Sequence, residues 1–272
     1  FITAFKEAGF KTAFLSNQNR NHSFIDKFGE EADTCIFIRE TSAGRIHYDT
    51  DLLDYIDQLI ANGSNRQLIV VHTYGSHFCY IDRYPHESAR FKPDDPAEAL
   101  KAFRNEQLNA YDNTISFTSG LLASIMDRLE LSGKRAALIY TSDHGEDIFD
   151  DNRNLFLHAS PCPSYYQIHV PFLIWTSSDF NERYPDLLNN ATANSDKFVA
   201  SSKAYFHTLM ELSGIESPRV IPSASLVNAT YTPEAPVYLN DHNQPVALRE
   251  SGLMPADFHK LDSIGVSCTD PN

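Results

Sequence analysis

Five short runs of apolar and β-branched residues, separated by longer helix-like patterns, constrain the fold of this 272-residue chain most strongly. Nearly continuous apolar runs are typical of strands covered on both faces, and strands that alternate with helices predict a parallel sheet. The predicted strands are 11–16, 34–38, 67–73, 136–142 and 170–176. We therefore expect an α/β fold, in which a largely parallel central sheet carries helices on both faces.

Several helical patterns accompany these strands. The chain opens on FITAFKEAGF, an amphipathic pattern with neither a Met nor a cap before it, so we expect the chain to be the interior of a longer protein. Other helices are predicted at 49–63, 96–133 and 201–214, and a late strand pair at 236–240 and 245–249. No repeat or clear boundary interrupts the chain, and we predict one domain over residues 1–272.

The charge balance excludes some function classes. The chain holds 22 Lys and Arg against 36 Asp and Glu, a net charge of −14. A nucleic-acid-binding protein would instead show a basic stripe, and adhesion to anionic lipid by charge alone is excluded for the same reason. An acidic surface is sufficiently explained by solubility. No apolar run approaches the roughly 18 residues of a membrane-spanning helix.

The four cysteines are widely spaced and form no C-x-x-C pair, which argues against a structural zinc cluster. They are Cys35, Cys79, Cys162 and Cys268. Their spacing leaves both disulfides and isolated thiols open. The CPSY segment at 162–165 superficially resembles the C/S-x-P-S/A-R site that sulfatases convert to formylglycine. The Pro follows the Cys directly and no Arg follows the Ser, so this interpretation is rejected.

Polar side chains follow three of the predicted strands where each strand ends. The first strand runs into SNQNRNH, the third into HTYGSH and the fourth into SDHGED. In an open parallel sheet, ligands bind beyond the carboxyl ends of the strands, on loops that a rigid sheet holds in place. Three such loops predict a shared site.

The adjacent Asp143 and His144 are the strongest candidates for metal ligands. Asp supplies a charged oxygen and His a neutral nitrogen, which suit zinc and can also take manganese. In a loop both side chains can face one ion, and Gly145 would let the backbone turn tightly behind them. The alternative is that Asp143 caps the next helix and His144 is a bystander.

Three further histidines have open roles. The Gly75-Ser76 turn would let His77 project over the sheet edge. His72 lies closer to the strand and is interpreted as a hydrogen-bonded structural residue. His158 is either a member of the site or a surface or packing residue.

Five segments, in this order, resemble the phosphoethanolamine transferases of Gram-negative bacteria. That family includes lipid A-modifying and mobile colistin-resistance enzymes, and it belongs to the alkaline phosphatase–sulfatase superfamily. The segments are HTYGSHFCYIDRYP, NEQLNAYDNTI, LIYTSDHGED, LHASP and HVPFLIW. SDHG is shared across the superfamily, whereas GSH with RYP and NAYDNT is more specific. The resemblance spans residues 1 to about 180 and implies an alkaline phosphatase/sulfatase-like fold.

The resemblance implies roles for six residues. Asp143 and His144 match the family's zinc ligands, so it implies one zinc ion and leaves a second open. His77 matches the histidine of the family's G-S-H motif, and His158 matches a histidine that lies near the phosphate or a second metal. We take both as catalytic. The SNQNRNH loop resembles a substrate-binding segment, which makes Gln18 and His22 substrate-binding candidates.

What the resemblance implies for the whole protein is a phospho-threonine mechanism. Phosphatidylethanolamine would be the donor and lipopolysaccharide, at lipid A or a core sugar, the acceptor. The enzyme would lie at the periplasmic face of the bacterial inner membrane, anchored by a region that precedes this chain. The nucleophilic Thr and a zinc-binding Glu have no counterpart here. We therefore expect a soluble C-terminal part of a catalytic domain, without its first strand and nucleophile helix and inactive alone.

The chain departs from the family pattern at two histidine motifs. Phe78 and Cys79 follow His77 where the family has Gly-Pro, and Ala159 follows His158 where the family has Gly. The larger residues could narrow the pocket, and Cys79 could pair with Cys162 in an oxidising periplasm. Alternative functions are a phosphoglycerol transferase, a metal-dependent phosphatase or sulfatase, or a non-catalytic module that kept the fold.

Overall fold

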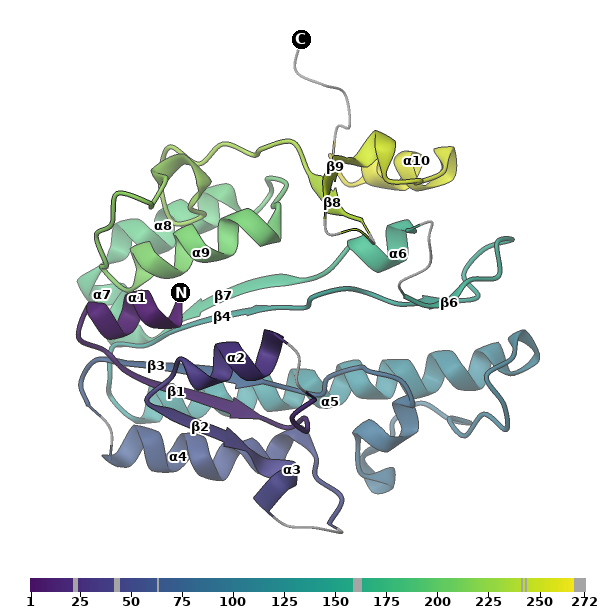
Figure 1. Ribbon diagram of the computed structural model, residues 1–272, viewed down its shortest axis with the longest axis horizontal. Coiled ribbons are helices and arrows are strands. Elements are labelled where there is room, and N and C mark those ends of the chain that lie inside the picture. Colours follow the sequence, from purple (N-terminus) through teal and green to yellow (C-terminus); the bar gives the residue numbers. More distant parts are fainter. Residues whose placement is uncertain are drawn as a thin grey trace. The chain divides into compact units, whose positions relative to one another are not determined.

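The computed structural model shows two compact units, Phe1–Gly133 and Lys134–Asn272 (Figure 1). It describes residues 1–21, 24–41, 45–62, 64–158, 163–240, 242 and 244–266. The predictions made for His22, Cys162 and Cys268 lie outside these residues. Each unit is described by itself.

The first unit is built on a three-stranded parallel sheet, as predicted. Its order is β2 (Thr34–Phe37), β1 (Lys11–Ser16) and β3 (Gln67–His72). In the central strand β1, every residue after Lys11 is buried, as expected for a strand covered on both faces. Ser16 pairs with both Phe37 and His72, so the three strands end at the same edge.

Helices flank this sheet. They are α1 (Ile2–Glu7), α2 (Phe24–Glu30), α3 (Ile38–Thr41), α4 (Leu53–Asn62) and α5 (Arg104–Leu131), with 3₁₀ turns at Asp49–Leu52, Tyr80–Arg83, His86–Ser88 and Lys101–Phe103. In Figure 1, α2 lies on the upper side of the strands and α4 on the lower side. Helix α2 packs on β1 and β2, and α4 packs on α5. The α/β class predicted from the sequence is confirmed.

Helix α5 begins at Arg104, not at residue 96 as predicted, and a 3₁₀ turn at Lys101–Phe103 precedes it. A side chain of the helix also binds the segment before residue 96. The Asn113 Oδ1 atom accepts hydrogen bonds from the backbone N–H groups of Arg90 and Phe91, at 2.7 and 2.9 Å. Its Nδ2 atom donates to the Tyr84 hydroxyl oxygen and to Asp94. Residues of the RYP and NAYDNT segments thus meet in one buried network.

Replacing Asn113 with alanine is expected to lower the free energy of unfolding by about 3 kcal/mol, because several buried groups lose their partner at once. Asn109→Ala is the matched control on the same helix. It removes a single exposed hydrogen bond to the Pro93 carbonyl and should cost about 1 kcal/mol. Urea titration measures both. Equal losses for the two variants would contradict this role of Asn113.

The second unit pairs β4 (Ala137–Thr141) with β7 (Phe172–Thr176) antiparallel, which corrects the prediction that these strands continue a parallel sheet. A parallel pair needs a long crossover, usually a helix. The described residues between β4 and β7 contain only a short hairpin and the one-turn helix α6 (Tyr165–Ile168). The chain therefore returns beside β4 in the opposite direction.

Two hairpins and several helices complete this unit. The hairpins pair β5 (Asp147–Ile148) with β6 (Phe156–Leu157), and β8 (Val237–Leu239) with β9 (Pro245–Ala247). The second pair confirms the predicted late strands. The helices are α7 (Ser178–Arg183), α8 (Pro185–Asn194), α9 (Ser201–Leu212) and α10 (Pro255–Ser263), with 3₁₀ turns at Pro222–Ala224 and Leu248–Glu250. Helix α9 was predicted. Helix α8 was missed, although its N-terminal Pro-Asp is typical of a helix start.

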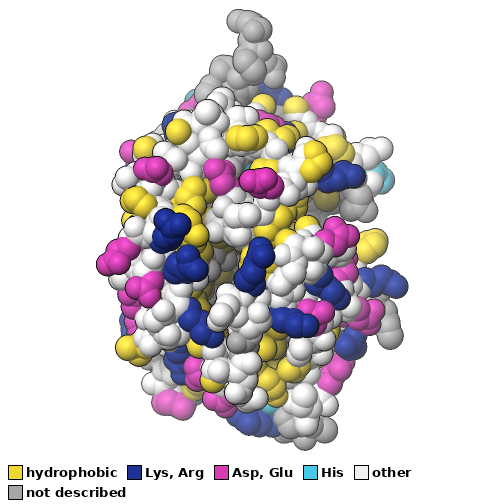
Figure 2. Space-filling model, turned by 90° about the vertical axis from the view of Figure 1, so that its left-hand side faces the viewer, with side chains coloured by type: hydrophobic (Ala, Val, Ile, Leu, Met, Phe, Trp, Pro, Cys, Tyr) yellow, Lys and Arg dark blue, Asp and Glu magenta, His cyan; other side chains and the backbone are white. Residues whose placement is uncertain are grey.

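One face of the molecule carries charged side chains of both signs (Figure 2). On the face shown in Figure 2, Lys and Arg side chains are interspersed with Asp and Glu. Within the part of the chain that the structure describes, no helix has both the length and the apolar character to cross a bilayer.

An ion cluster joins α10 to the turn of the β5–β6 hairpin. The Arg153 guanidinium donates to both carboxylate oxygens of Asp257, at 2.7 and 2.8 Å, and to Asp151. The side chain of Asp257 is fully buried. Burial alone raises the pKa of Asp257, but hydrogen bonds from Arg153, Tyr165 N and Met254 N outweigh it and hold the pKa below its ordinary value.

This lowered pKa predicts a pH dependence of stability. The folded-state pKa of Asp257 is below the unfolded value of about 3.9, so its contribution is fully present above pH 4 and is lost as the pH falls through the folded value. The difference in unfolding free energy between the wild type and Asp257→Asn should therefore shrink below about pH 4. Urea titrations at several pH values measure it. A difference that stays constant down to pH 2 would contradict the assignment.

Candidate metal centre

Three side chains of the second unit converge on one point: His144, Glu146 and His158. One potential ligand atom from each lies within 4.8 Å of the others. The Glu146 Oε1 atom is 3.0 Å from His158 Nδ1 and 4.0 Å from His144 Nδ1, and the two imidazole rings stack with centroids 3.6 Å apart. Two neutral nitrogens and a carboxylate form a donor set that suits zinc.

The β5–β6 hairpin brings Glu146 and His158 together from positions 12 residues apart in the sequence. Asp147 pairs with Leu157 in this hairpin. Glu146 and His158 are the next residues outward on the two strands, so the antiparallel register places them opposite each other. His158 therefore lies in one cluster with His144. This arrangement agrees with the interpretation of His158 as a member of the site rather than as a surface or packing residue.

Hydrogen bonds orient both imidazoles. His144 Nδ1 lies 3.0 Å from the Gly145 carbonyl oxygen. Because a carbonyl only accepts, this nitrogen carries the proton and leaves the Nε2 lone pair for an ion. His158 Nδ1 is engaged by the Glu146 carboxylate, which likewise leaves its Nε2. A carboxylate or carbonyl behind each imidazole is the arrangement by which proteins fix histidine ligands.

The predicted ligand Asp143 lies at the solvent side of this cluster. Its Oδ2 atom is 3.6 Å from His144 Nε2, and its side chain is 86% exposed, against 4% for Glu146. Two ligands of a tetrahedral zinc ion lie about 3.3 Å apart, so Asp143 and His144 can share one ion. Sequence reasoning missed Glu146, which stands in the same SDHGED segment as both of them.

Gly145 has a different role from the one expected. A Cβ atom on Gly145 would lie 2.0 Å from the Tyr166 carbonyl oxygen, and the Gly145 N–H donates to the Gln167 carbonyl at 2.7 Å. The glycine is required by this close approach of the two backbones. Next to it, the buried Asp147 accepts hydrogen bonds from Ser164 and Gln167, and burial raises the pKa of its carboxyl group.

The strand-end loops of the first unit hold the other predicted residues. The Gln18 side chain donates to the Thr73 carbonyl at 3.3 Å and so links the loops after β1 and β3. The predicted structural role of His72 is confirmed by its 2.9 Å hydrogen bond with the Ser16 hydroxyl. His77 is exposed, and Arg83 donates to its carbonyl at 2.9 Å.

The thiols of Cys35 and Cys79 are free.

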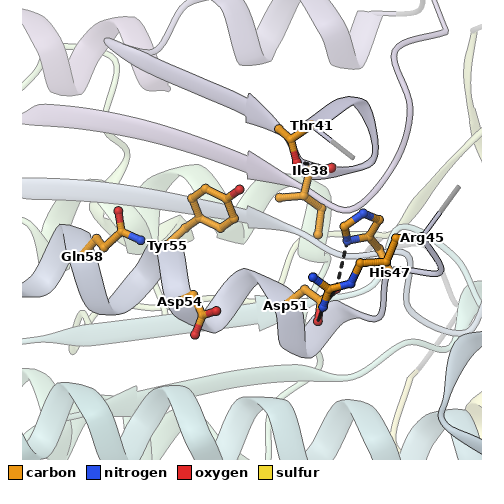
Figure 3. Close-up of a pocket in the computed structure, with 8 residues that line it drawn as sticks. All are labelled: Ile38, Thr41, Arg45, His47, Asp51, Asp54, Tyr55 and Gln58. Carbon is orange, nitrogen blue, oxygen red and sulfur yellow. Dashed lines mark hydrogen bonds and ion pairs between the residues drawn. The ribbon is translucent and has the colours of Figure 1, made fainter. Parts of the chain in front are cut away.

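A cavity of about 250 Å³ lies elsewhere in the first unit (Figure 3). Its lining includes Arg45, His47 and Asp51, and His47 Nδ1 is 2.9 Å from the Asp51 carboxylate. Figure 3 shows both basic side chains reaching the same carboxylate. Of the predicted site residues that the structure describes, none lines this cavity.

Comparison with known proteins defines the family. The family model described as Sulfatase matches residues 1–215, and the chain belongs to this family. It is 26% identical over 239 residues to the phosphoethanolamine transferase EptC of Escherichia coli strain K12, an alignment that covers 83% of this chain and 40% of that protein. It is 33% identical over 140 residues to the Kdo(2)-lipid A phosphoethanolamine 7''-transferase of Salmonella typhimurium strain LT2, covering 50% of this chain and 24% of the relative.

Among solved structures, the chain is similar to the C-terminal periplasmic domain of Escherichia coli EptC in complex with Zn. The TM-score is 0.79 at 23% identity, over 98% of this chain and 74% of the other. This likeness confirms the predicted sulfatase-like fold. The chain spans less than half the length of the curated relatives it matches.

Proposed function

We propose that the protein containing this chain transfers phosphoethanolamine from phosphatidylethanolamine to lipopolysaccharide, at lipid A or a core sugar. The observation that carries the proposal is the His144–Glu146–His158 cluster in a sulfatase-family chain whose matched relatives are named phosphoethanolamine transferases. The family match crosses the boundary between the two units, which supports one catalytic domain made of both.

Zinc is the proposed cofactor, since the similar EptC domain was crystallised with Zn and the donor set here fits it. The ion would be held by His144, His158 and a carboxylate, either that of Asp143 or the second oxygen of Glu146, whose Oε1 contacts His158 Nδ1. Bound there, it would supply a Lewis acid that polarises phosphate oxygens and makes a hydroxyl nucleophile more acidic.

The chain's own residues then have defined tasks. Glu146 keeps the His158 ring oriented through the 3.0 Å contact to Nδ1. The exposed His77 stabilises charge on the transferring phosphate or moves the proton of the entering or leaving oxygen, and a neutral imidazole suits that role near pH 7. Gln18 is proposed to contact substrate, and so is His22. The nucleophilic Thr is assigned to the region that precedes this chain, where it would carry phosphoethanolamine as a covalent intermediate.

The location is proposed from the relatives. The similar structure of Escherichia coli EptC is described as a C-terminal periplasmic domain, and the lipooligosaccharide phosphoethanolamine transferase A (EptA) of Neisseria meningitidis as an integral membrane protein. We place the whole protein at the periplasmic face of the inner membrane, anchored outside this chain.

Intact-mass measurement of the whole protein, after incubation with zinc and phosphatidylethanolamine, tests the proposal. We expect a gain of one phosphoethanolamine group that disappears in the His144→Ala variant. A gain with phosphatidylglycerol instead would assign a phosphoglycerol transferase. An adduct with neither lipid, together with no bound zinc, would indicate a non-catalytic module.

A further inference from the structure

The hairpin that carries Glu146 and His158 is too short to fix their spacing by itself. Strands β5 and β6 contribute two residue pairs, and an isolated two-stranded hairpin of any length is marginally stable in water. Three of its non-glycine residues have left-handed backbones: Phe149, Asn154 and Leu157, with φ of 53°, 54° and 67°. Such conformations cost about 1–3 kcal/mol each and persist only where surrounding contacts impose them.

Two sets of contacts supply this support. At the open end of the hairpin, Asp147 is tied to Ser164 and Gln167 at 2.9 and 2.6 Å. At the turn, Arg153 forms a two-pronged ion pair with Asp257 of α10. The first set fixes the ends of the strands beside the ligands. The second set fixes the turn that joins them.

Asp257 is itself held rigidly. Besides Arg153, its carboxylate accepts the backbone N–H groups of Tyr165 and Met254, at 3.0 and 2.9 Å. Its helix is anchored by an apolar core of buried side chains, Leu248, Leu253, Leu261 and Val266, against which Tyr165 and Ile168 of α6 also pack. A two-pronged guanidinium–carboxylate pair transmits orientation as well as attraction, because both partners are planar.

We propose that Arg153 and Asp257 are positioning residues of the metal centre. Their ion pair holds the hairpin turn against α10 and thereby fixes the distance between Glu146 and His158. The inference rests on the proposed function, since it takes the cluster to hold zinc. Helix α10 lies beyond residue 215, where the match to the family model ends, so this support comes from outside the matched segment.

Zinc affinity of the whole protein, measured by competition with a chromogenic chelator, tests the inference. Asp257→Asn keeps the shape of the side chain and removes its charge, and Arg153→Lys keeps the charge and removes the planar fork. Each is expected to weaken zinc binding by about 10-fold, the lower end of the effect of losing a group that binds a metal ligand directly, because these two residues act one step further out. The matched control is Asp262→Asn, an exposed residue on the same helix, which should bind zinc like the wild type.

The affinity is measured at a temperature where circular dichroism shows each variant to be folded, so a loss of stability alone would not change it. Arg153→Lys provides the measurement if Asp257→Asn does not fold. Wild-type affinity in both folded variants would overturn the inference and leave the proposed function standing. No zinc binding by the wild type would overturn both.

Discussion

Replacing His158 with alanine is expected to weaken zinc binding by at least about 100-fold, more than the loss of an outer partner. The substitution removes one of two imidazoles in the cluster and leaves the Glu146 carboxylate, 4% exposed, without its partner at 3.0 Å. Because the metal is proposed to act on the phosphate itself, formation of the phosphoethanolamine adduct should fall to background in the same variant.

His259→Ala is the control for this prediction. His259 is an exposed residue of α10, so its loss should change neither zinc affinity nor adduct formation. Isothermal titration with zinc and intact-mass measurement read out the two properties. If His158→Ala and His259→Ala bound zinc equally well, the imidazole of His158 would not be a ligand.

Replacing Gly145 with alanine is expected to lower both the stability of the protein and its zinc affinity, and this is the second-largest effect that we predict. The new Cβ atom would lie 2.0 Å from the Tyr166 carbonyl oxygen. No rotamer change can relieve this contact, because the backbone of residue 145 fixes the position of its Cβ and the oxygen belongs to the backbone of Tyr166. Either the loop with His144 or the segment with Gln167 must move, at a cost of about 3 kcal/mol. The movement separates His144 from Glu146, so zinc affinity should fall together with stability.

Gly120→Ala is the matched control for this change. Gly120 lies inside α5, and a Cβ atom there would meet nothing within 4 Å. The substitution should stabilise the protein by about 0.5–1 kcal/mol, since alanine is the better helix former. Thermal and urea unfolding compare the two. A similar effect of both substitutions would show that the contact with Tyr166 does not constrain residue 145.

The sequence predicted those strands whose side chains are apolar on both faces. The runs at 11–16 and 67–73 became β1 and β3, because continuous apolar runs have few other places to bury their side chains. The direction of a strand relative to its neighbour depends on the segment that connects the two strands, because a parallel pair needs a long crossover. The long stretch between β4 and β7 contains no crossover helix among its described residues, and the pair formed antiparallel.

Part of the site could also be predicted. Asp143 and His144 are adjacent, so their pairing needs no tertiary information. The meeting of His144 with His158 depends on the β5–β6 hairpin, whose strands of two residues are too short to show a periodic pattern. Glu146 was missed because its role follows from the register of that hairpin.

The roles of some other residues depend on contacts with residues far away in the sequence, which a local sequence pattern cannot predict. Gly145 was expected to serve a tight turn, but the reason for a glycine is a backbone contact with residue 166, twenty-one positions along the chain. Asn113 accepts hydrogen bonds from the backbone of residues 90 and 91, which lie more than twenty positions before it. The roles of Gln18 and His77 as substrate and phosphate contacts stay predictions.

X-ray absorption spectroscopy at the zinc edge of the zinc-loaded protein tests the central claim most directly. The account predicts two imidazole nitrogens and carboxylate oxygen at about 2.0–2.2 Å, and one imidazole fewer in the His144→Ala variant. Sulfur ligands at about 2.3 Å, or a spectrum unchanged by His144→Ala, would show that zinc binds elsewhere and that the His144–Glu146–His158 cluster is not the metal centre.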